Sequence, residues 1–157
     1  MDHELLNGLS PAEIEQVMAL GARELVPSGS WLFRLGDPAD RIFLLERGRI
    51  RLTLPMQLRG GDEEILIEEN APGQTVGWSA LIPPHRFTLS ARAPLETEVI
   101  ALPRTALREF FERSPQVAYK MSFNLCIIVG HRLQLVQTMW LREMQRSVQL
   151  RSDAGAR

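Results

Sequence analysis

The sequence of 157 residues is poor in cysteine, in aromatic residues and in long apolar runs. Its single cysteine, Cys126, excludes a disulfide framework, an all-cysteine zinc site and a four-thiolate iron–sulfur cluster within one chain. None of its apolar runs approaches the roughly 20 residues of a membrane-spanning helix. The acidic start at residues 1–4 is not typical of a signal peptide. We therefore expect a cytoplasmic protein without a membrane segment.

The chain also lacks a strong excess of charge, since its formal net charge is −1. The two signs are unevenly divided, however. Residues 1–103 carry 9 basic and 15 acidic side chains, whereas residues 104–157 carry 9 basic and 4 acidic ones. A basic C-terminal third indicates either a solvated helix face or contact with nucleic acid or an acidic partner. We favour the solvated face, because the basic residues are scattered.

Two kinds of pattern follow one another along the first two thirds of the chain. Ser10 and Glu13 form the Ser-x-x-Glu capping pattern and predict a helix over residues 10–22. Short apolar or alternating runs then recur between turns rich in glycine, proline and aspartate. They predict strands near residues 31–35, 41–45, 49–54, 64–68, 87–91 and 98–102. That spacing favours an antiparallel jelly-roll sandwich or barrel.

Helical patterns return after Pro103, with a short helix over residues 104–111 and a long one over residues 115–150. The long helix would span about 54 Å, whereas a body of this size is only about 35 Å across. Part of its apolar stripe therefore needs another surface, and a second copy of the chain is the simplest one. The predicted homodimer interface consists of Val129, Leu133, Val136, Trp140 and Met144. A frayed end of a truncated chain is the alternative.

The predicted fold class is accordingly α+β, mainly β. An antiparallel jelly roll is flanked by an N-terminal helix and a long C-terminal dimerisation helix. We divide the chain into a jelly-roll domain over residues 8–114 and the dimer helix over residues 115–150.

This order of elements resembles the cyclic nucleotide-binding domain family, and specific motifs carry the resemblance. Residues 33–40 and 42–50, with a Gly-Asp turn and a glycine-containing hairpin, are similar to the family's first signature. Residues 72–73 and 77–81, followed by Arg86, resemble its phosphate-binding cassette. The likeness is closest to the sensor half of Crp/Fnr bacterial regulators, whose long helix forms the dimer.

The resemblance implies a ligand site at Gly77, Trp78, Ser79, Ala80, Arg86 and Phe87. Gly77 would allow a close approach of the backbone, the amides of Ser79 and Ala80 would face the phosphate, and Arg86 would supply the charge. The implied ligand is cyclic AMP, cyclic GMP or another phosphate-bearing molecule.

The cassette departs from the family pattern at two places. Trp78 occupies the position at which nucleotide-binding members carry a glutamate for the ribose 2′-hydroxyl. Arg86 follows Gly77 by only nine positions, fewer than usual. On the long helix, Val136 and Gln137 stand where cyclic AMP-binding members often have hydroxyl residues. These departures predict weak cyclic AMP binding.

Other reactive residues do not form a recognisable site. His3, His85 and His131 lie far apart in the sequence, so we predict no metal centre, although His85 adjoins Arg86 and is the best candidate for a ligand contact. Cys126 lies in an apolar run and is predicted to be a buried, inert thiol. No catalytic set stands out, and we predict that the chain is not an enzyme.

Three functions remain open. The first is a regulatory sensor that acts through its homodimer helix on a protein partner. The second is a degenerate dimerisation or interaction domain that binds no nucleotide. The third is the effector domain of a transcription regulator separated from its DNA-binding half. The chain ends about seven residues after the predicted helix, so we expect no direct DNA binding by this chain.

Overall fold

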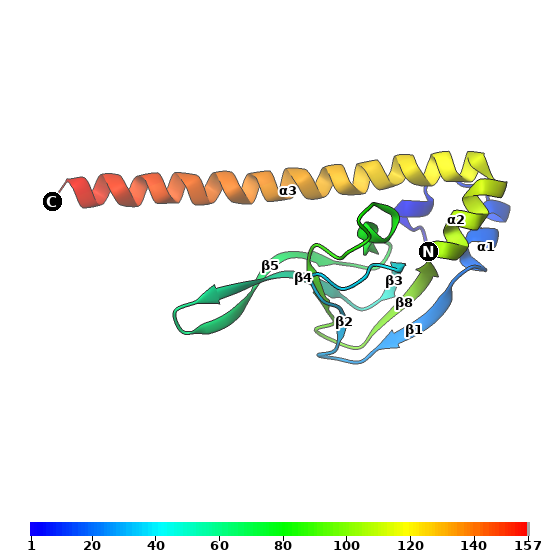
Figure 1. Ribbon diagram of the computed structural model, residues 1–157, viewed down its shortest axis with the longest axis horizontal. Helices are drawn as coiled ribbons and strands as arrows, with labels where there is room; N and C mark the ends of the chain where they lie inside the picture. The colour runs from blue at the N-terminus through cyan, green and yellow to red at the C-terminus, as the bar shows by residue number, and fades with distance from the viewer. Residues whose placement is uncertain (157) are drawn as a thin grey trace.

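The computed structural model describes residues 1–156, and its elements follow the predicted order. They are η1 (Glu4–Leu6), α1 (Pro11–Met18), β1 (Ala22–Val26), β2 (Trp31–Phe33), β3 (Arg41–Arg47), β4 (Ile50–Leu58), β5 (Gly61–Asn70), β6 (Thr75–Val76), η2 (Trp78–Leu81), β7 (Ser90–Arg92), β8 (Thr97–Pro103), α2 (Arg104–Arg113) and α3 (Pro115–Gly155). The predicted α+β fold, an antiparallel sandwich with flanking helices, is confirmed (Figure 1).

The strands form two four-stranded antiparallel sheets that make up the sandwich. Their orders are β1-β8-β3-β6 and β2-β7-β4-β5, so neighbours in a sheet are mostly distant in sequence. In the first sheet, β3 lies between β8 and β6, with Phe43 opposite Ala101 and also opposite Val76. Residues 42–45 of β3 are all buried, as expected for a central strand that is covered on both faces.

The corner between β3 and β4 depends on Gly48. This residue has a φ of 93°, and a Cβ atom there would lie only 2.8 Å from the carbonyl oxygen of Glu96. The hydroxyl of Thr97 donates to the carbonyl oxygen of Arg49 at 2.9 Å. The corner therefore packs against the start of β8 so closely that only glycine fits.

The first helix starts as predicted and ends earlier. The amide of Glu13 donates to the hydroxyl of Ser10 at 3.2 Å, and the amide of Ser10 donates to the Glu13 carboxylate at 2.7 Å. This confirms the capping box. The helix ends at Met18 because residues 22–26 form an additional strand, β1, which pairs with β8. Only two of the five residues of β1 are buried or half-buried. The sequence of this strand therefore shows little of the alternation between apolar and polar residues that would have predicted it.

The long helix α3 has one half on the body and one half beyond it (Figure 1). It begins at Pro115, as predicted, and continues to Gly155. Val117, Met121 and Ile128 of its first half are buried in the core. Asn124 fixes this half to the N-terminal segment, because its side-chain amide donates to the carbonyl oxygens of Leu5 at 2.9 Å and Asn7 at 2.8 Å.

The prediction of a buried Cys126 is wrong, since its side chain is exposed. Leu125 and Ile128 form the buried face of the helix at this point, whereas Ile127 is 44% exposed. Successive helical residues are rotated by about 100°. Cys126 therefore shares the outer face despite the apolar residues on both sides of it in the sequence.

Candidate functional site

The turn between β6 and η2 carries the glycine that the sequence singled out. Gly77 has a φ of 82°, in the left-handed region that favours glycine. A Cβ atom there would lie 3.2 Å from the rings of both Phe43 and Phe87. The close approach at this turn is therefore made by the chain's own aromatic residues.

Four of the predicted site residues meet at one small cavity, which we call the cassette cavity. They are Gly77, Trp78, Ser79 and Phe87, and the lining is completed by Phe33, Leu52, Thr88, Leu89 and Arg132. Its free volume is about 10 Å³, which leaves room for at most about one water molecule. The cavity is thus closed in this structure.

Stacked aromatic rings account for the closure. Phe87 lies on Phe33 with ring centroids 3.7 Å apart and an interplanar angle of 8°. Phe33 is itself 5.9 Å from Phe43. Such a pair contributes about 0.5–1.5 kcal/mol beyond the burial of its surface, so opening the cavity requires these contacts to separate.

Ala80, which was predicted to present a free amide, is fully buried and does not line the cavity. Its N–H donates to the carbonyl oxygen of Gly77 at 3.0 Å, within the turn. Ser79 lines the cavity and is buried. Of the two predicted amides, only that of Ser79 is therefore in a position to face the cavity.

Arg86 is not among the residues that line the cassette cavity. Its guanidinium is exposed and donates from Nη1 to the carbonyl oxygen of Gly36 at 2.8 Å. Residue 86 also bridges Pro38 in an antiparallel pair. Adjacent residues of an extended chain point to opposite sides, so the inward position of Phe87 places Arg86 outside.

A different arginine, Arg132 of α3, lines the cavity. Its side chain is only 12% exposed and forms an ion pair with Glu68 of β5. Its Nε is buried and has no hydrogen-bond partner within residues 1–156. The sequence holds a signal for this residue, because Arg132 interrupts the apolar stripe four residues after Ile128 and four before Val136.

Glu68 and Arg132 also act on a carboxyl group of the N-terminal segment, Glu4. Burial raises the pKa of Glu4 above its ordinary value, and the negative charge of Glu68 acts in the same direction. A hydrogen bond from the amide of Thr75, at 2.8 Å, and the nearby positive charge of Arg132 act in the opposite direction. The carboxyl group therefore holds its proton more tightly than an exposed glutamate.

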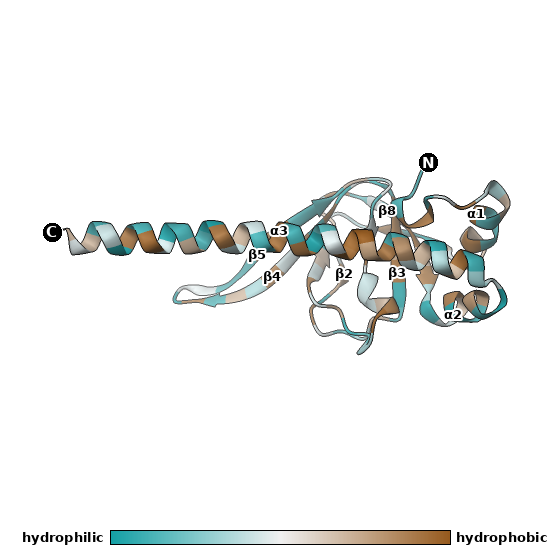
Figure 2. Ribbon diagram, turned by 90° about the horizontal axis from the view of Figure 1, so that it is seen from above, coloured by the Kyte–Doolittle hydropathy of each residue, from teal (hydrophilic) through white to brown (hydrophobic). Residues whose placement is uncertain are grey.

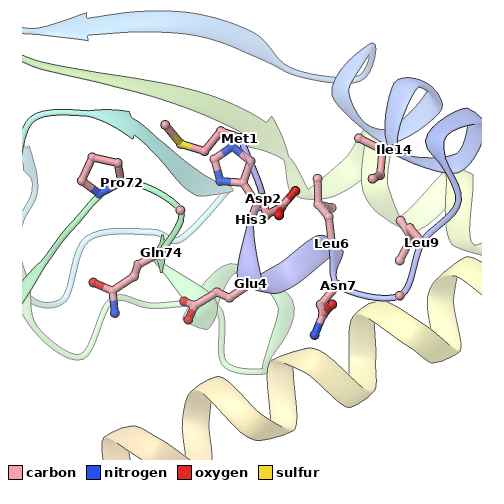
Figure 3. A pocket seen from close by; sticks show the side chains of 12 residues that line it. Met1, Asp2, His3, Glu4, Leu6, Asn7, Leu9, Ile14, Pro72 and Gln74 are labelled. Carbon is pink, nitrogen blue, oxygen red and sulfur yellow. The ribbon is translucent and has the colours of Figure 1, made fainter.

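A larger hollow lies beside Glu4, with a volume of about 590 Å³. Figure 3 shows the side chains around it, which come from residues 1–4 and 6–9, from Ile14 and from the turn at Pro72 and Gln74. His3 in this lining is buried, and its Nε2 lies 2.7 Å from the Glu46 carboxylate. His3 and Glu4 of this lining are thus engaged with the body of the domain.

Neither a metal cluster nor a membrane helix is found among the described residues. No three His, Cys, Asp or Glu side chains of residues 1–156 are grouped closely enough to hold a metal ion. Within the same part of the chain, no helix combines the length and the apolar character needed to cross a bilayer.

The predicted dimer residues fall into two groups. Val129 is half-buried and packs against the core. Leu133, Val136, Trp140 and Met144 are 57%, 43%, 64% and 46% exposed. Figure 2 shows that hydrophobic residues continue to recur along α3 beyond the body. The exposed apolar stripe therefore belongs to the part of α3 that the chain itself does not cover.

Comparisons with known proteins agree with this architecture. Residues 23–114 match the family model of the cyclic nucleotide-binding domain. The chain is 29% identical over 130 residues to the cyclic AMP receptor protein of Thermus thermophilus, covering 83% of this chain and 57% of that protein. It is 26% identical over 132 residues to glutaminase 1 of Bradyrhizobium diazoefficiens, covering 84% of this chain and 20% of that protein.

Among solved structures, the chain is similar to the N-terminal domain of a transcriptional regulator from Streptomyces coelicolor. The TM-score is 0.68 at 23% identity, covering 84% of this chain and 89% of that one. This similarity shows a shared fold. The chain thus spans little more than half of one curated relative and a fifth of the other.

Proposed function

Because the chain belongs to the cyclic nucleotide-binding domain family, we propose that it is a regulatory module that acts through pairing of two α3 helices, with its cassette cavity closed by its own side chains. We assign no reaction to it. None of the residues that line the cassette cavity is a histidine or a carboxylate, so the cavity offers no acid–base pair.

The observation that carries this proposal is the filled cassette cavity. Its free volume is about 10 Å³, whereas small-molecule sites usually occupy about 300–1,000 Å³. A cyclic nucleotide could enter only if Phe87 left Phe33 and η2 moved away from the sheet. The ligand would then have to offset the loss of a well-packed aromatic cluster.

The charges around the cavity support the same conclusion. Arg86 uses its guanidinium on the carbonyl oxygen of Gly36, outside the cavity. Arg132 lines the cavity but is neutralised by Glu68. Trp78 can donate a hydrogen bond from its indole N–H but cannot accept one from a ribose hydroxyl. A cyclic phosphate in this cavity therefore meets one guanidinium, already paired with Glu68, and finds no carboxylate in the lining for a ribose hydroxyl.

The signalling part of the proposal is based on α3. Leu133, Val136, Trp140 and Met144 follow one another at steps of three and four, the spacing of one helix face. Two copies of such a face bury each other in a parallel or antiparallel helix pair. A partner protein that binds the body of the domain could change the packing of this helix pair. The change in packing would then be the regulatory signal.

A ligand-binding sensor is the second candidate, and the state of Arg132 favours it. Its side chain is largely buried, yet its Nε lacks a hydrogen-bond partner within the described chain. An anion that displaced Glu68 could satisfy both the charge and this donor. In this case α3 itself, through Arg132, would hold the ligand.

Calorimetric titration with cyclic AMP and cyclic GMP separates the two candidates. For the closed module, we expect no heat of binding and a shift in Tm below about 2 °C at about 1 mM nucleotide. Micromolar binding would contradict the closed cavity. If binding occurs, the variant Arg132→Gln and the matched variant Arg86→Gln identify the arginine that holds the phosphate. The ligand-binding sensor requires that binding is lost in Arg132→Gln alone.

A further inference from the structure

A third cavity lies between the cassette turn and the helices, and we call it the helix-side cavity. Its walls come from η2 and the loop after it, from α2 and from the first half of α3, and its volume is about 390 Å³. It shares no lining residue with the cassette cavity. Its volume falls within the range of about 300–1,000 Å³ that is typical of small-molecule sites.

One wall of the helix-side cavity is cationic. Arg104 and Arg108 both line it, and they lie one turn apart on the same face of α2. None of the residues that line it is an aspartate or a glutamate. The carboxylate of Glu112 lies 4.0 Å from the guanidinium of Arg108, at an exposed position outside the lining. The lining therefore carries two positive charges and no negative one, and Glu112 offsets part of the Arg108 charge at the surface.

Arg104 carries an additional indication of a missing partner. Its Nε is buried, and it has no hydrogen-bond partner within residues 1–156. A buried donor without a partner costs free energy, so such a group normally has a ligand, a water or an ion beside it. The cavity that Arg104 lines is the space from which such a partner can come.

The rest of the lining includes three large apolar side chains. Leu81 follows the cassette turn, Phe111 comes from α2 and Leu125 from α3. Phe111 and Leu81 pack against the core on their inner sides, so their positions are fixed by the body. An occupant that satisfied only the arginines would leave this apolar surface facing water, so the site fits a molecule with an apolar body and an anionic head.

His85 adds a rigid polar group at the rim. It has a φ of 57°, a backbone conformation that non-glycine residues rarely adopt. Its carbonyl oxygen accepts a hydrogen bond from the amide of Ala39 at 2.7 Å, and its ring Nδ1 lies 3.0 Å from the carbonyl oxygen of Ala80. When Nδ1 donates to that oxygen, the ring is held in place and Nε2 is the nitrogen left for an occupant of the cavity.

We propose that the helix-side cavity binds a small organic anion, a carboxylate or phosphate monoester attached to an apolar chain or ring. The head group pairs with Arg104 and Arg108, and the apolar body packs on Leu81, Phe111 and Leu125. An occupant touches η2, α2 and α3 at once, so it links the jelly roll to the dimer helix. The site does not depend on whether the cassette cavity opens.

Four linear eight-carbon probes with different head groups test this proposal by calorimetry. Octanoate and octyl phosphate are expected to bind with dissociation constants below about 1 mM. We expect 1-octanol to bind at least about tenfold more weakly, and octylammonium not to bind. Equal binding of 1-octanol and octanoate, or no binding of either anion, would overturn the proposal.

Variants of α2 locate the binding site. Arg104→Gln is expected to weaken octanoate binding about tenfold and Arg108→Gln, which is more exposed, about threefold. Arg113→Gln is the matched control, because Arg113 is an exposed arginine of the same helix that does not line the cavity. Unchanged binding in the first two variants, or an equal loss in Arg113→Gln, would show that the anion binds elsewhere and would overturn the assignment.

Discussion

Side-chain direction decides the chemistry of the cassette. Phe87 and Arg86 are neighbours in the sequence, yet the ring of Phe87 stacks on Phe33 inside the sandwich while the guanidinium of Arg86 binds the carbonyl oxygen of Gly36 outside. Arg132, from a distant helix, takes the place beside the cavity. The fold therefore turns Arg132, and not Arg86, toward the cassette cavity.

A pH-dependent stability is expected from Glu4. Folding raises its pKa above 4.5, chiefly through burial, so the folded state binds this proton more tightly than the unfolded state. The free energy of unfolding should therefore fall as the pH rises from the unfolded-state pKa through the raised folded-state pKa. Glu4→Gln stays neutral and keeps an acceptor for the Thr75 amide, so it should remove this part of the pH dependence.

Urea unfolding at a series of pH values between about 4 and 7 measures the effect of Glu4→Gln. Glu15→Gln, at an exposed position of α1, is the control for the loss of a carboxylate. Curves for Glu4→Gln and the parent that run parallel over this range would contradict the role given to Glu4.

The helices and strands of this fold differ in how completely their apolar faces are buried within the chain. The sheets bury their inner faces against each other, and α2 buries Leu107 and Phe110 on the body. In α3, by contrast, residues 117–128 include the buried positions, and no position after 128 in the described chain is buried. At 41 residues, the helix is about 61 Å long, which exceeds what one small domain can cover.

The uncovered part of α3 predicts that the protein is a dimer. Val136→Glu together with Trp140→Glu places two charges on the exposed apolar stripe and should leave a folded monomer. Light scattering after size exclusion, at tens of micromolar protein, measures the mass of parent and variant. The control is Gln134→Glu with Gln145→Glu, two charges at exposed polar positions on another face of the same helix. A monomeric parent would contradict the prediction.

At the scale of the whole molecule, the two halves of α3 differ in what stabilises them. Its first half is fixed to the body by the core and by the hydrogen bonds of Asn124 to Leu5 and Asn7. Lys120 also binds the Glu13 carboxylate of α1 at 2.9 Å. Its second half has no such contacts within the described chain, so we expect its helical structure to depend on a partner.

Hydrogen exchange should reveal this division. We expect amides of residues 117–128 to be protected at every protein concentration, and amides after residue 135 to gain protection as the concentration rises, because dimerisation orders them. In the Val136→Glu, Trp140→Glu variant the distal amides should exchange rapidly at all concentrations. Equal protection of both halves in dilute parent protein would show that α3 is stable by itself.

Local patterns in the sequence determined much of this protein. The capping box at Ser10 and Glu13, the helix start at Pro115 and most strands were predictable, because hydrogen bonds and side-chain periodicity there involve residues a few positions apart. The family motifs around Gly48 and Gly77 were predictable for a similar reason, since tight turns at those positions require a positive φ. These features are set by local interactions and do not depend on how distant segments of the chain pack.

The tertiary structure alone decided the orientation of the site. Strand β1 exists because β8 pairs with it, and Cys126 is exposed because the body covers only one face of α3. Arg86 points outward because Phe87 fills the interior, while Arg132 reaches the cassette only through the way α3 crosses the sandwich. Each of these outcomes depends on packing between segments that are distant in sequence. In such packing, the burial of one side chain fixes the direction of another. The local sequence pattern carries no information about that direction.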